Sequence, residues 1–471
     1  MTGLLLFILC ALLLVGGYMV YGRLAEKIYG LNRNMEMPCG KLADGVDYVC
    51  MPTWRVFMIQ LLNIAGLGPV FGALAGCLFG PVCLLWIVLG CILAGAVHDF
   101  MAAMASAERN GENLPEFIGQ QLGKTALLIM RGLCILLMLL VGVVFTSGPA
   151  GMLHGMVESV SVVWWCAIIM LYYFLATVLP INVIIGKIYP LFGFLFLFMA
   201  IGLAVALPCS GYEILPNTDF LTNVHPKGLS AWPMLFVTIA CGAISGFHAT
   251  QSPMMVRCLG SAKNMRPVFY GAMITEGLVA LIWAVVGMSL RDVIGLDSIT
   301  PAVAVNKACS LLLGPVGAVI AVLGVVVLPI TSGDTAMRCC RLMMADVLHL
   351  SQSSVRNRLI LALPLFLLVI IIANLDFSII WRYFGWANQA LSCFTLWALA
   401  VLLRSKGRFH WVVSLPAFFM TNVCICFLLC SPDCLIALPV GLSTCVSIAV
   451  SSLCFICFMC YCKPESKKLP H

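Results

Sequence analysis

The sequence predicts an all-α polytopic membrane protein, with about thirteen transmembrane helices in one transmembrane domain that covers residues 1–471. Hydrophobic residues make up 62% of the chain and charged residues only 10%, whereas about a quarter of the residues in a soluble domain are charged. Apolar stretches of about 20 residues, the length that spans a bilayer, recur along the whole chain. The basic residues are also distributed unevenly between the predicted loops, as expected for a membrane protein with a fixed orientation.

The helices are placed by apolar stretches that end at polar residues, glycine or proline. These stretches lie at 3–22, 53–78, 82–106, 125–148, 161–181, 188–208, 232–254, 268–290, 309–331, 357–375, 377–403, 410–431 and 435–461. The first stretch has no preceding basic region and no small-residue cleavage site, so we interpret it as a retained helix.

The basic residues predict the orientation. If the N-terminus is outside, all 26 lysines and arginines except Lys227, Arg291, Lys307 and Arg382 lie in cytoplasmic segments. An odd number of helices then places the C-terminus in the cytoplasm. No separate soluble domain and no nucleic-acid motif is visible, so the expected surroundings are membrane lipid, and the sequence does not predict the oligomeric state.

Two of the predicted helices contain helix-breaking residues at matching positions. The second helix contains Gly66-Leu67-Gly68-Pro69, and the seventh contains Gly242, Gly246 and Pro253. Each begins a run of five helices, at 53–208 and 232–403, and because five is odd the two runs have inverted topology. Paired broken helices in inverted halves are typical of a transporter site near the bilayer midplane. Close helix packing is the alternative role for these glycines.

The layout therefore has one extra N-terminal helix at 3–22 and two extra C-terminal helices at 410–461. The 24 cysteines lie mostly in apolar stretches, where cysteine behaves as a small buried hydrophobe, so we expect no disulfide framework. Cys454, Cys457, Cys460 and Cys462 have spacings compatible with a metal or redox site, but they fall in a continuous apolar helix, which favours packing.

Several segments together resemble the bacterial carbon starvation protein CstA family, in order from about residue 20 to about residue 410. They are Asp44–Val49, Ile64–Pro69, Ala94–Phe100, Cys241–His248, Tyr270–Met273 with Glu276, Thr331–Thr335 and Trp381–Gln389. The resemblance implies a secondary transporter of the bacterial inner membrane with LeuT-type inverted repeats of five helices, linked to uptake of peptides and of pyruvate during carbon starvation. This chain departs from the family in two respects. It has the stretch Met58–Asn63 where members commonly carry a histidine pair, and it is shorter than the long members.

The broken helices are the expected substrate-binding site. A helix break leaves N–H groups unpaired at one half-helix and carbonyls unpaired at the other, which suits a carboxylate together with a cation. We expect the backbone near the breaks to bind the carboxylate and nearby polar side chains to add hydrogen bonds, with interhelical polar contacts as the alternative role for each side chain. The backbone set is Gly66, Gly68, Gly246 and Phe247, and the side-chain set is Gln60, Asn63, Ser245, His248 and Gln251.

Carboxylates within apolar helices are the expected ion-coupling groups, because a charge at this depth is expensive. Asp334 with Thr331, Ser332 and Thr335 offers the hard oxygen ligands that suit Na⁺, and the carboxylate alone suits H⁺. We expect irregular backbone after Pro329, and an Asp334–Arg338 ion pair is the alternative.

Asp99 and Glu276 lie in equivalent helices of the two runs. We expect either a structural pair, with His98 or an arginine as partner, or proton handling. Asp376 is a further acidic residue near a helix end. Trp386, Asn388 and Gln389 either line a cavity or lock neighbouring helices.

The function predicted from these features is secondary active import of a small carboxylate-bearing nutrient, a peptide or pyruvate, by H⁺ or Na⁺ symport. We expect no cofactor, because apart from a coupling ion nothing in the sequence requires one. The chain lacks the GxxxxGK[ST] phosphate loop of ATP-driven machinery and has no catalytic motif such as HExxH or GxSxG, so an enzyme is disfavoured. A nutrient sensor with a transporter fold is the alternative.

Overall fold

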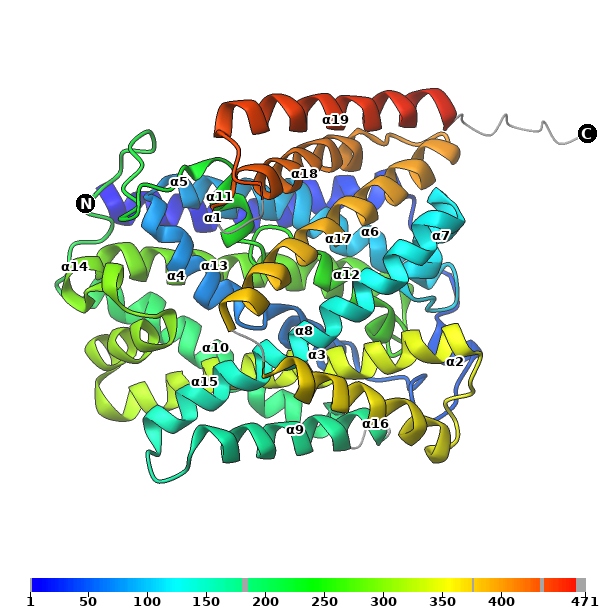
Figure 1. Cartoon of the computed structure of the whole chain (residues 1–471), viewed down its shortest axis with the longest axis horizontal. Coiled ribbons are helices and arrows are strands. Elements are labelled where there is room, and N and C mark those ends of the chain that lie inside the picture. The colour runs from blue at the N-terminus through cyan, green and yellow to red at the C-terminus, as the bar shows by residue number, and fades with distance from the viewer. Residues whose placement is uncertain (1, 180–184, 375–376, 433–435, 463–471) are drawn as a thin grey trace, which may run out of the picture.

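The computed structural model describes residues 2–462 except 180–184, 375–376 and 433–435. All regular secondary structure within these residues is helical. One isolated β-bridge joins Met51 and Leu259. The main helices run roughly side by side along the long axis (Figure 1). Helix α1 (Thr2–Tyr29) begins at one end of that axis and α19 (Val440–Tyr461) finishes at the opposite end.

The first half of the chain contains several long helices and several short helical segments. They are α2 (Pro38–Lys41), α3 (Thr53–Ala65), η1 (Gly68–Gly72), α4 (Ala73–Gly76), η2 (Cys77–Phe79), α5 (Val82–Leu85), η3 (Trp86–Gly95), α6 (Ala96–Ala107), α7 (Leu114–Leu122), α8 (Lys124–Met156), α9 (Val162–Val178) and α10 (Ile185–Cys209). Helix α7 lies in a stretch without a predicted helix. It is short and only partly apolar, so it gives no transmembrane signal.

The second half follows the same pattern of long helices joined by short ones. It consists of α11 (Ala231–Thr238), α12 (Gly246–Val256), η4 (Ala262–Asn264), η5 (Arg266–Tyr270), α13 (Gly271–Ser289), α14 (Arg291–Ile294), η6 (Leu296–Ser298), α15 (Pro301–Leu348), α16 (Val355–Ile372), α17 (Phe377–Ser405), α18 (Trp411–Cys430) and α19. Helix α15 packs along α8 and α10, and α12 packs against α6 and α17.

The predicted apolar stretches each overlap a helix or a broken helix. By length and composition, ten described helices are able to cross a membrane, or up to eleven when the bent pair Thr53–Ala65 and Gly68–Phe79 counts as one span. Helix α9 is shorter and apolar, and the α11–α12 pair is broken. The all-α polytopic fold is therefore confirmed, whereas the count of thirteen and the repeat boundaries stay predictions.

Exposed apolar side chains cover the outward faces of the outer helices. In α1, Leu5, Leu9, Leu12 and Val20 are exposed, and α16 exposes a similar row. Such surfaces are unusual in a soluble monomer but are what a lipid-facing helix needs. The polar residues discussed below lie in the interior, so the membrane-facing shell surrounds the candidate site.

Candidate functional site

The first predicted helix break is present. Helix α3 ends at Ala65, and Gly66 follows with φ of 46° and ψ of −145°, a backbone conformation that favours glycine. Pro69 then starts the next turn without an N–H to donate. The half-helices on either side meet at 52°. The glycines and the proline therefore act as helix breakers here rather than as packing residues only.

The second break is also present, although its residues differ partly from those predicted. Helix α11 ends at Thr238 and α12 begins at Gly246, with Gly242 between them at φ of +90°. Pro253 lies inside α12, about two turns after the helix begins, and is therefore not part of the break. A proline in a membrane helix is tolerated when neighbouring groups satisfy the freed carbonyl.

The two breaks face each other at close range. A Cβ added to Gly68 would lie 2.1 Å from Cβ of Cys241, and one added to Gly242 would lie 4.0 Å from Cα of Pro69. Glycine at 68 is therefore required for the approach of the two chain segments. The sequence prediction that both breaks belong to one site agrees with this geometry.

A cavity of about 420 Å³ lies beside the breaks. Its walls come from the first break, the second break and α17, including Gly68, Cys241 and Asn388. It extends to Leu229 and Ser431, which lie at the start of α11 and just after the end of α18. In Figure 1, α11 lies toward the end of the molecule where α1 begins, whereas α2 and α7 lie toward the opposite end.

Asn388 holds the start of α12 in place. Its Oδ1 accepts hydrogen bonds from the Phe247 N–H at 2.7 Å and the Ser245 hydroxyl at 3.0 Å. The Phe247 N–H, which we expected to bind a carboxylate, is thus already used. Gly246 packs directly on α17, because an added Cβ would lie 2.4 Å from the Asn388 carbonyl oxygen. Asn388 fulfils both roles considered for it, since it lines the cavity and locks two helices.

Of the predicted substrate-binding residues, only Gly68 lines this cavity. Gln60 and Asn63 are fully buried on α3, and within the described structure their amide groups have no hydrogen-bond partner. Gln251 instead donates to the Thr250 hydroxyl at 2.9 Å. Sequence reasoning missed lining residues such as Thr238, Phe384 and Gly385, because apolar or small side chains in a helix give no functional signal.

The predicted coupling segment departs from expectation. Residues 331–335 form regular helix in the middle of α15, and the only non-helical backbone inside α15 lies at Gly314. The prediction of irregular backbone after Pro329 was therefore wrong. The Asp334–Arg338 pair is also not formed, because Arg338 contacts Asp47 instead, at 3.0 Å.

Asp334 accepts two hydrogen bonds from tyrosine hydroxyls. Tyr172 of α9 donates at 2.6 Å to one carboxyl oxygen, and Tyr189 of α10 donates at 2.5 Å to the other. Both tyrosines lie about 150 residues away in sequence, so only the fold reveals this arrangement. No lysine or arginine among the described residues forms a salt bridge with this buried carboxyl.

Thr331 and Ser332 connect α15 to the first break. The Ser332 hydroxyl donates to the Leu62 carbonyl at 2.9 Å, and the Thr331 hydroxyl lies 3.3 Å from the same oxygen. Thr335 bonds within its own helix, to the Thr331 carbonyl at 3.1 Å. Hydroxyl and carbonyl oxygens thus converge where α3 ends, and such hard oxygen atoms suit a small cation.

Asp99 and Glu276 belong to one buried cluster. Asp99 of α6 lies 2.8 Å from Nδ1 of His98 and 2.9 Å from Nδ1 of His248 on α12. Nε2 of His248 lies 3.6 Å from Glu276 of α13. The expected histidine partner of Asp99 is therefore present, and no arginine takes part. His248, predicted as a substrate ligand, belongs to this cluster rather than to the cavity wall.

A buried ionic contact fixes the loop before α3. Asp47 lies 3.0 Å from Arg338 and 3.3 Å from Arg341, both on α15. Arg338 also donates to the carbonyls of Ala176 and Leu179. Burial favours the neutral carboxyl, but the two guanidinium groups outweigh it and hold the pKa of Asp47 below its ordinary value.

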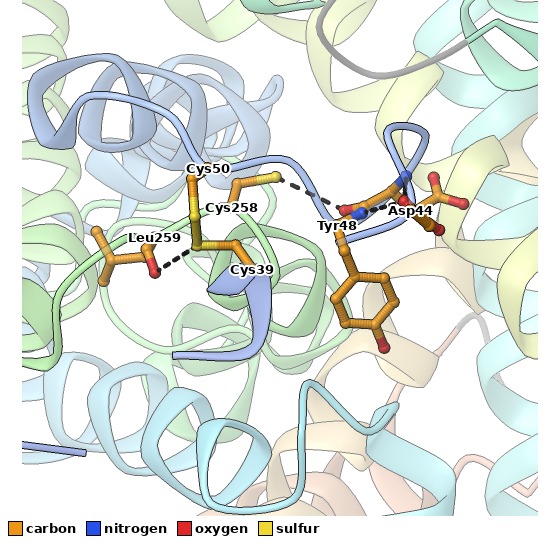
Figure 2. Close-up of a disulfide and its surroundings, with 7 residues drawn as sticks. Cys39, Asp44, Tyr48, Cys50, Cys258 and Leu259 are labelled. Carbon is orange, nitrogen blue, oxygen red and sulfur yellow. Dashed lines mark hydrogen bonds between the residues drawn. A yellow bond between two sulfur atoms is a disulfide. The ribbon is translucent and has the colours of Figure 1, made fainter. Parts of the chain in front are cut away.

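The loop shape is set locally by Asp44. Its Oδ1 accepts hydrogen bonds from the N–H groups of Val46, Asp47 and Tyr48 at 2.8–2.9 Å. Short acidic side chains commonly bind nearby backbone in this way. Figure 2 shows Asp44 and Tyr48 in this turn, beside the disulfide. The geometry of the turn is thus determined within a few residues of sequence.

A disulfide between Cys39 and Cys50 closes the same loop over 11 residues (Figure 2). We expected no disulfide framework, and this bridge corrects that expectation for one pair. These two cysteines lie in the same predicted loop between apolar helices, 11 residues apart. After Cys50, the Met51 N–H donates to the Cys258 carbonyl at 3.0 Å, so the loop also attaches to the end of α12.

The C-terminal cysteines considered from their spacing lie along and just after one helix. Cys454, Cys457 and Cys460 lie on α19, and Cys462 follows it. Within the described residues, the one group of potential metal ligands is Cys241, His248 and Glu276. Asp376 lies outside the described residues.

Comparison with solved structures identifies the class of fold. The chain is similar to a mutant of the Eremococcus coleocola manganese transporter, with a TM-score of 0.53 and 14% identity over 89% of this chain and 97% of that one. It is also similar to MhsT in complex with L-phenylalanine, with a TM-score of 0.54 and 12% identity over 87% of this chain and 98% of that one. The fold is that of LeuT-type membrane transporters, with two broken helices facing each other.

A family profile described as carbon starvation protein CstA matches residues 2–155, 149–312 and 303–426. The chain belongs to this family, which confirms the resemblance found in the sequence. An uncharacterized membrane protein of Haemophilus influenzae is 40% identical over 61% of this chain and 91% of its own length.

Two relatives with functional names are more distant. The peptide transporter CstA of Bacillus subtilis is 27% identical over 58% of this chain and 56% of its own length. The pyruvate/proton symporter BtsT of Escherichia coli is 28% identical over 57% of this chain and 46% of its own length. The match thus spans about half the length of these two relatives.

Proposed function

We propose that the protein is a secondary active transporter that imports a small carboxylate-bearing nutrient, a short peptide or pyruvate, by cation symport across the bacterial inner membrane. The observation that carries this proposal is the cavity beside two facing helix breaks. Its lining includes α11, whereas α2, which precedes the Asp47 loop, lies toward the opposite end of the molecule (Figure 1). Alternating access requires such a one-sided arrangement around a central site.

The chemistry of the site supports a small anionic solute. A cavity of about 420 Å³ is at the lower end of the usual range for small-molecule sites. None of the described residues that line it is basic, so we propose that backbone N–H groups at the start of η1 bind the carboxylate. The unpartnered amides of Gln60 and Asn63 lie one to two turns before the break and supply further hydrogen bonds along the inward route.

The coupling cation that fits Asp334 is a proton. A carboxyl at bilayer depth normally marks an ion or proton path, and the described partners of this one are tyrosine hydroxyls and not basic side chains. The name of the Escherichia coli relative, a pyruvate/proton symporter, supports the same choice. Na⁺ bound by Thr331, Ser332 and the Leu62 carbonyl is the second candidate, favoured by the convergence of those oxygens.

Competition for uptake tests the carboxylate claim. The purified protein is reconstituted in liposomes, and uptake of labelled pyruvate and of a labelled dipeptide is measured with and without unlabelled competitors. A substrate with a free carboxylate should compete with its labelled form, while its methyl ester, which has nearly the same shape but no charge, should not. Equal competition by acid and ester would contradict carboxylate recognition at the helix breaks.

A further inference from the structure

The geometry points to a transition-metal site, best suited to Zn²⁺, formed by Cys241, His248 and Glu276 at the second helix break. The three ligands come from different elements, namely the break itself, α12 and α13. A thiolate, an imidazole and a carboxylate are the ligand types that Zn²⁺ takes in proteins. The site is separate from the coupling segment on α15 and adjoins the cavity.

The spacing of the ligand atoms suits one ion. One ligand atom from each residue lies within 4.8 Å of the others, and Nε2 of His248 lies 3.6 Å from Oε2 of Glu276. Ligands at Zn²⁺ bond lengths of about 2.0–2.3 Å in tetrahedral geometry lie roughly 3.3–3.7 Å apart. A side-chain adjustment of about 1 Å at the widest pair completes this geometry.

Two of the three proposed ligands present atoms without a partner, whereas the Cys241 thiol lies 3.7 Å from the Ser245 hydroxyl and would exchange that weak hydrogen bond for the ion. Nε2 of His248 and both carboxyl oxygens of Glu276 are buried without a hydrogen bond in the described structure, and both side chains are 0% exposed. Buried polar atoms are normally hydrogen-bonded, so unpartnered ones indicate a missing water, ion or ligand. One ligand atom each of His248, Glu276 and Cys241 lies within 4.8 Å of the other two.

Asp99 orients the histidine ligand. Its carboxylate lies 2.9 Å from Nδ1 of His248, which keeps that nitrogen engaged and leaves Nε2 for the ion. Metal-binding histidines characteristically use their second nitrogen in this way, because the carboxylate fixes the ring and increases its basicity. Asp99 is itself fixed by His98 at 2.8 Å. This chain of contacts makes Asp99 a positioning residue for the site.

The cavity provides a route to the site. Cys241 lines the cavity, and its sulfur would lie 2.5 Å from a Cβ added to Gly68. Two ligand anions, a thiolate and a carboxylate, balance the charge of a divalent ion, which a buried site requires. Three protein ligands leave a fourth position for water or for a cavity solute. An ion bound here would tie the second break to α13.

Cobalt spectroscopy tests the site, because Co²⁺ replaces Zn²⁺ and reports thiolate ligation by a charge-transfer absorption band. The full-length protein is purified in detergent with Cys454, Cys457, Cys460 and Cys462 changed to serine, so that exposed thiols near α19 bind no ion. After chelator treatment it is titrated with Co²⁺. We expect one Co²⁺ per chain, a thiolate band, and loss of the band when Zn²⁺ is added.

Variants separate this site from other cysteines. Cys241→Ser should abolish the band, and Cys77→Ser, which alters another fully buried thiol outside the cluster, should leave it unchanged. Glu276→Gln should weaken Co²⁺ binding at least about tenfold while the thiolate band remains at saturation. Size-exclusion profiles and the unaltered Cys77→Ser titration show that the proteins are folded.

Two results would overturn the inference. One is a parent protein that shows no thiolate band at one equivalent of Co²⁺, and the other is an equal band in Cys241→Ser. Either result would mean that Cys241, His248 and Glu276 do not bind one ion together.

Discussion

Asp334 accepts hydrogen bonds from two tyrosine hydroxyls and forms no salt bridge with a described lysine or arginine, so it is the carboxyl that we propose for coupling. Asp334→Asn keeps nearly the same shape but removes the exchangeable proton. We expect solute accumulation against a gradient to disappear, while exchange of labelled for unlabelled solute continues, as measured in proteoliposomes. Tyr189→Phe, which removes one hydrogen bond and keeps the carboxyl, should retain accumulation.

The Asp334 hypothesis fails if the Asn variant still concentrates solute with an unchanged response to pH and sodium. The Na⁺ site at the end of α3 would instead be supported if uptake by the parent protein depends on sodium and is lost in the double variant Thr331→Ala, Ser332→Ala.

Asn388 joins the second break to α17, and its effect is expected on both stability and transport. Asn388→Ala leaves the Phe247 N–H and the Ser245 hydroxyl without their acceptor, which should cost about 1–3 kcal/mol and lower the thermal unfolding temperature. Asn388→Asp keeps the acceptor oxygen and should be milder in the same thermal assay. Equal unfolding temperatures for the Ala variant and the parent would contradict this role.

At the scale of elements, the Asp47 loop joins the end of α12 to α15 and α9. Asp47→Asn leaves two buried guanidinium groups without their carboxylate, so we expect the free energy of unfolding to fall by about 3–5 kcal/mol. Denaturation monitored by fluorescence measures the change. Asp292→Asn, at an exposed position, is the control and should be near neutral.

The same loop predicts a pH dependence. Because the pKa of Asp47 is lower in the folded protein than in the unfolded chain, its stabilisation is complete above the unfolded pKa of about 3.9. It is lost as pH falls through the lower folded pKa. We therefore expect the parent protein to lose stability below about pH 4 and the Asp47→Asn variant to lose less over that range. Parallel curves for the two proteins would contradict the assignment.

The positions of the helices and of the helix breaks could be predicted from the sequence. Apolar stretches located the long helices because lipid-facing segments need no pattern finer than hydrophobicity, and Gly66 and Gly242 located the breaks because their backbone conformations favour glycine. Contacts between distant segments gave no such signal. The Asp334–Tyr172, Asp334–Tyr189 and Asp47–Arg338 pairs, and the His248–Glu276 contact, depend on how helices pack in three dimensions.

At the scale of the whole molecule, orientation is the first question. The distribution of basic residues predicts that the Asp47 loop lies in the cytoplasm, whereas its Cys39–Cys50 disulfide is a feature more typical of oxidising compartments. A cysteine introduced beside Lys227 should react with an impermeant thiol reagent added outside intact cells, and one at Ser405 should not, in a background without reactive native cysteines. The reverse labelling pattern would support the side indicated by the disulfide.

Transport driven by a proton gradient is the central claim, because it separates a symporter from a sensor that only binds solute. The most direct measurement is accumulation of labelled pyruvate in proteoliposomes with an imposed inward proton gradient. The proposed function predicts accumulation above the external concentration, which collapses when an ionophore dissipates the gradient. Binding of the solute without accumulation or exchange, at any imposed gradient of protons or sodium, would contradict it.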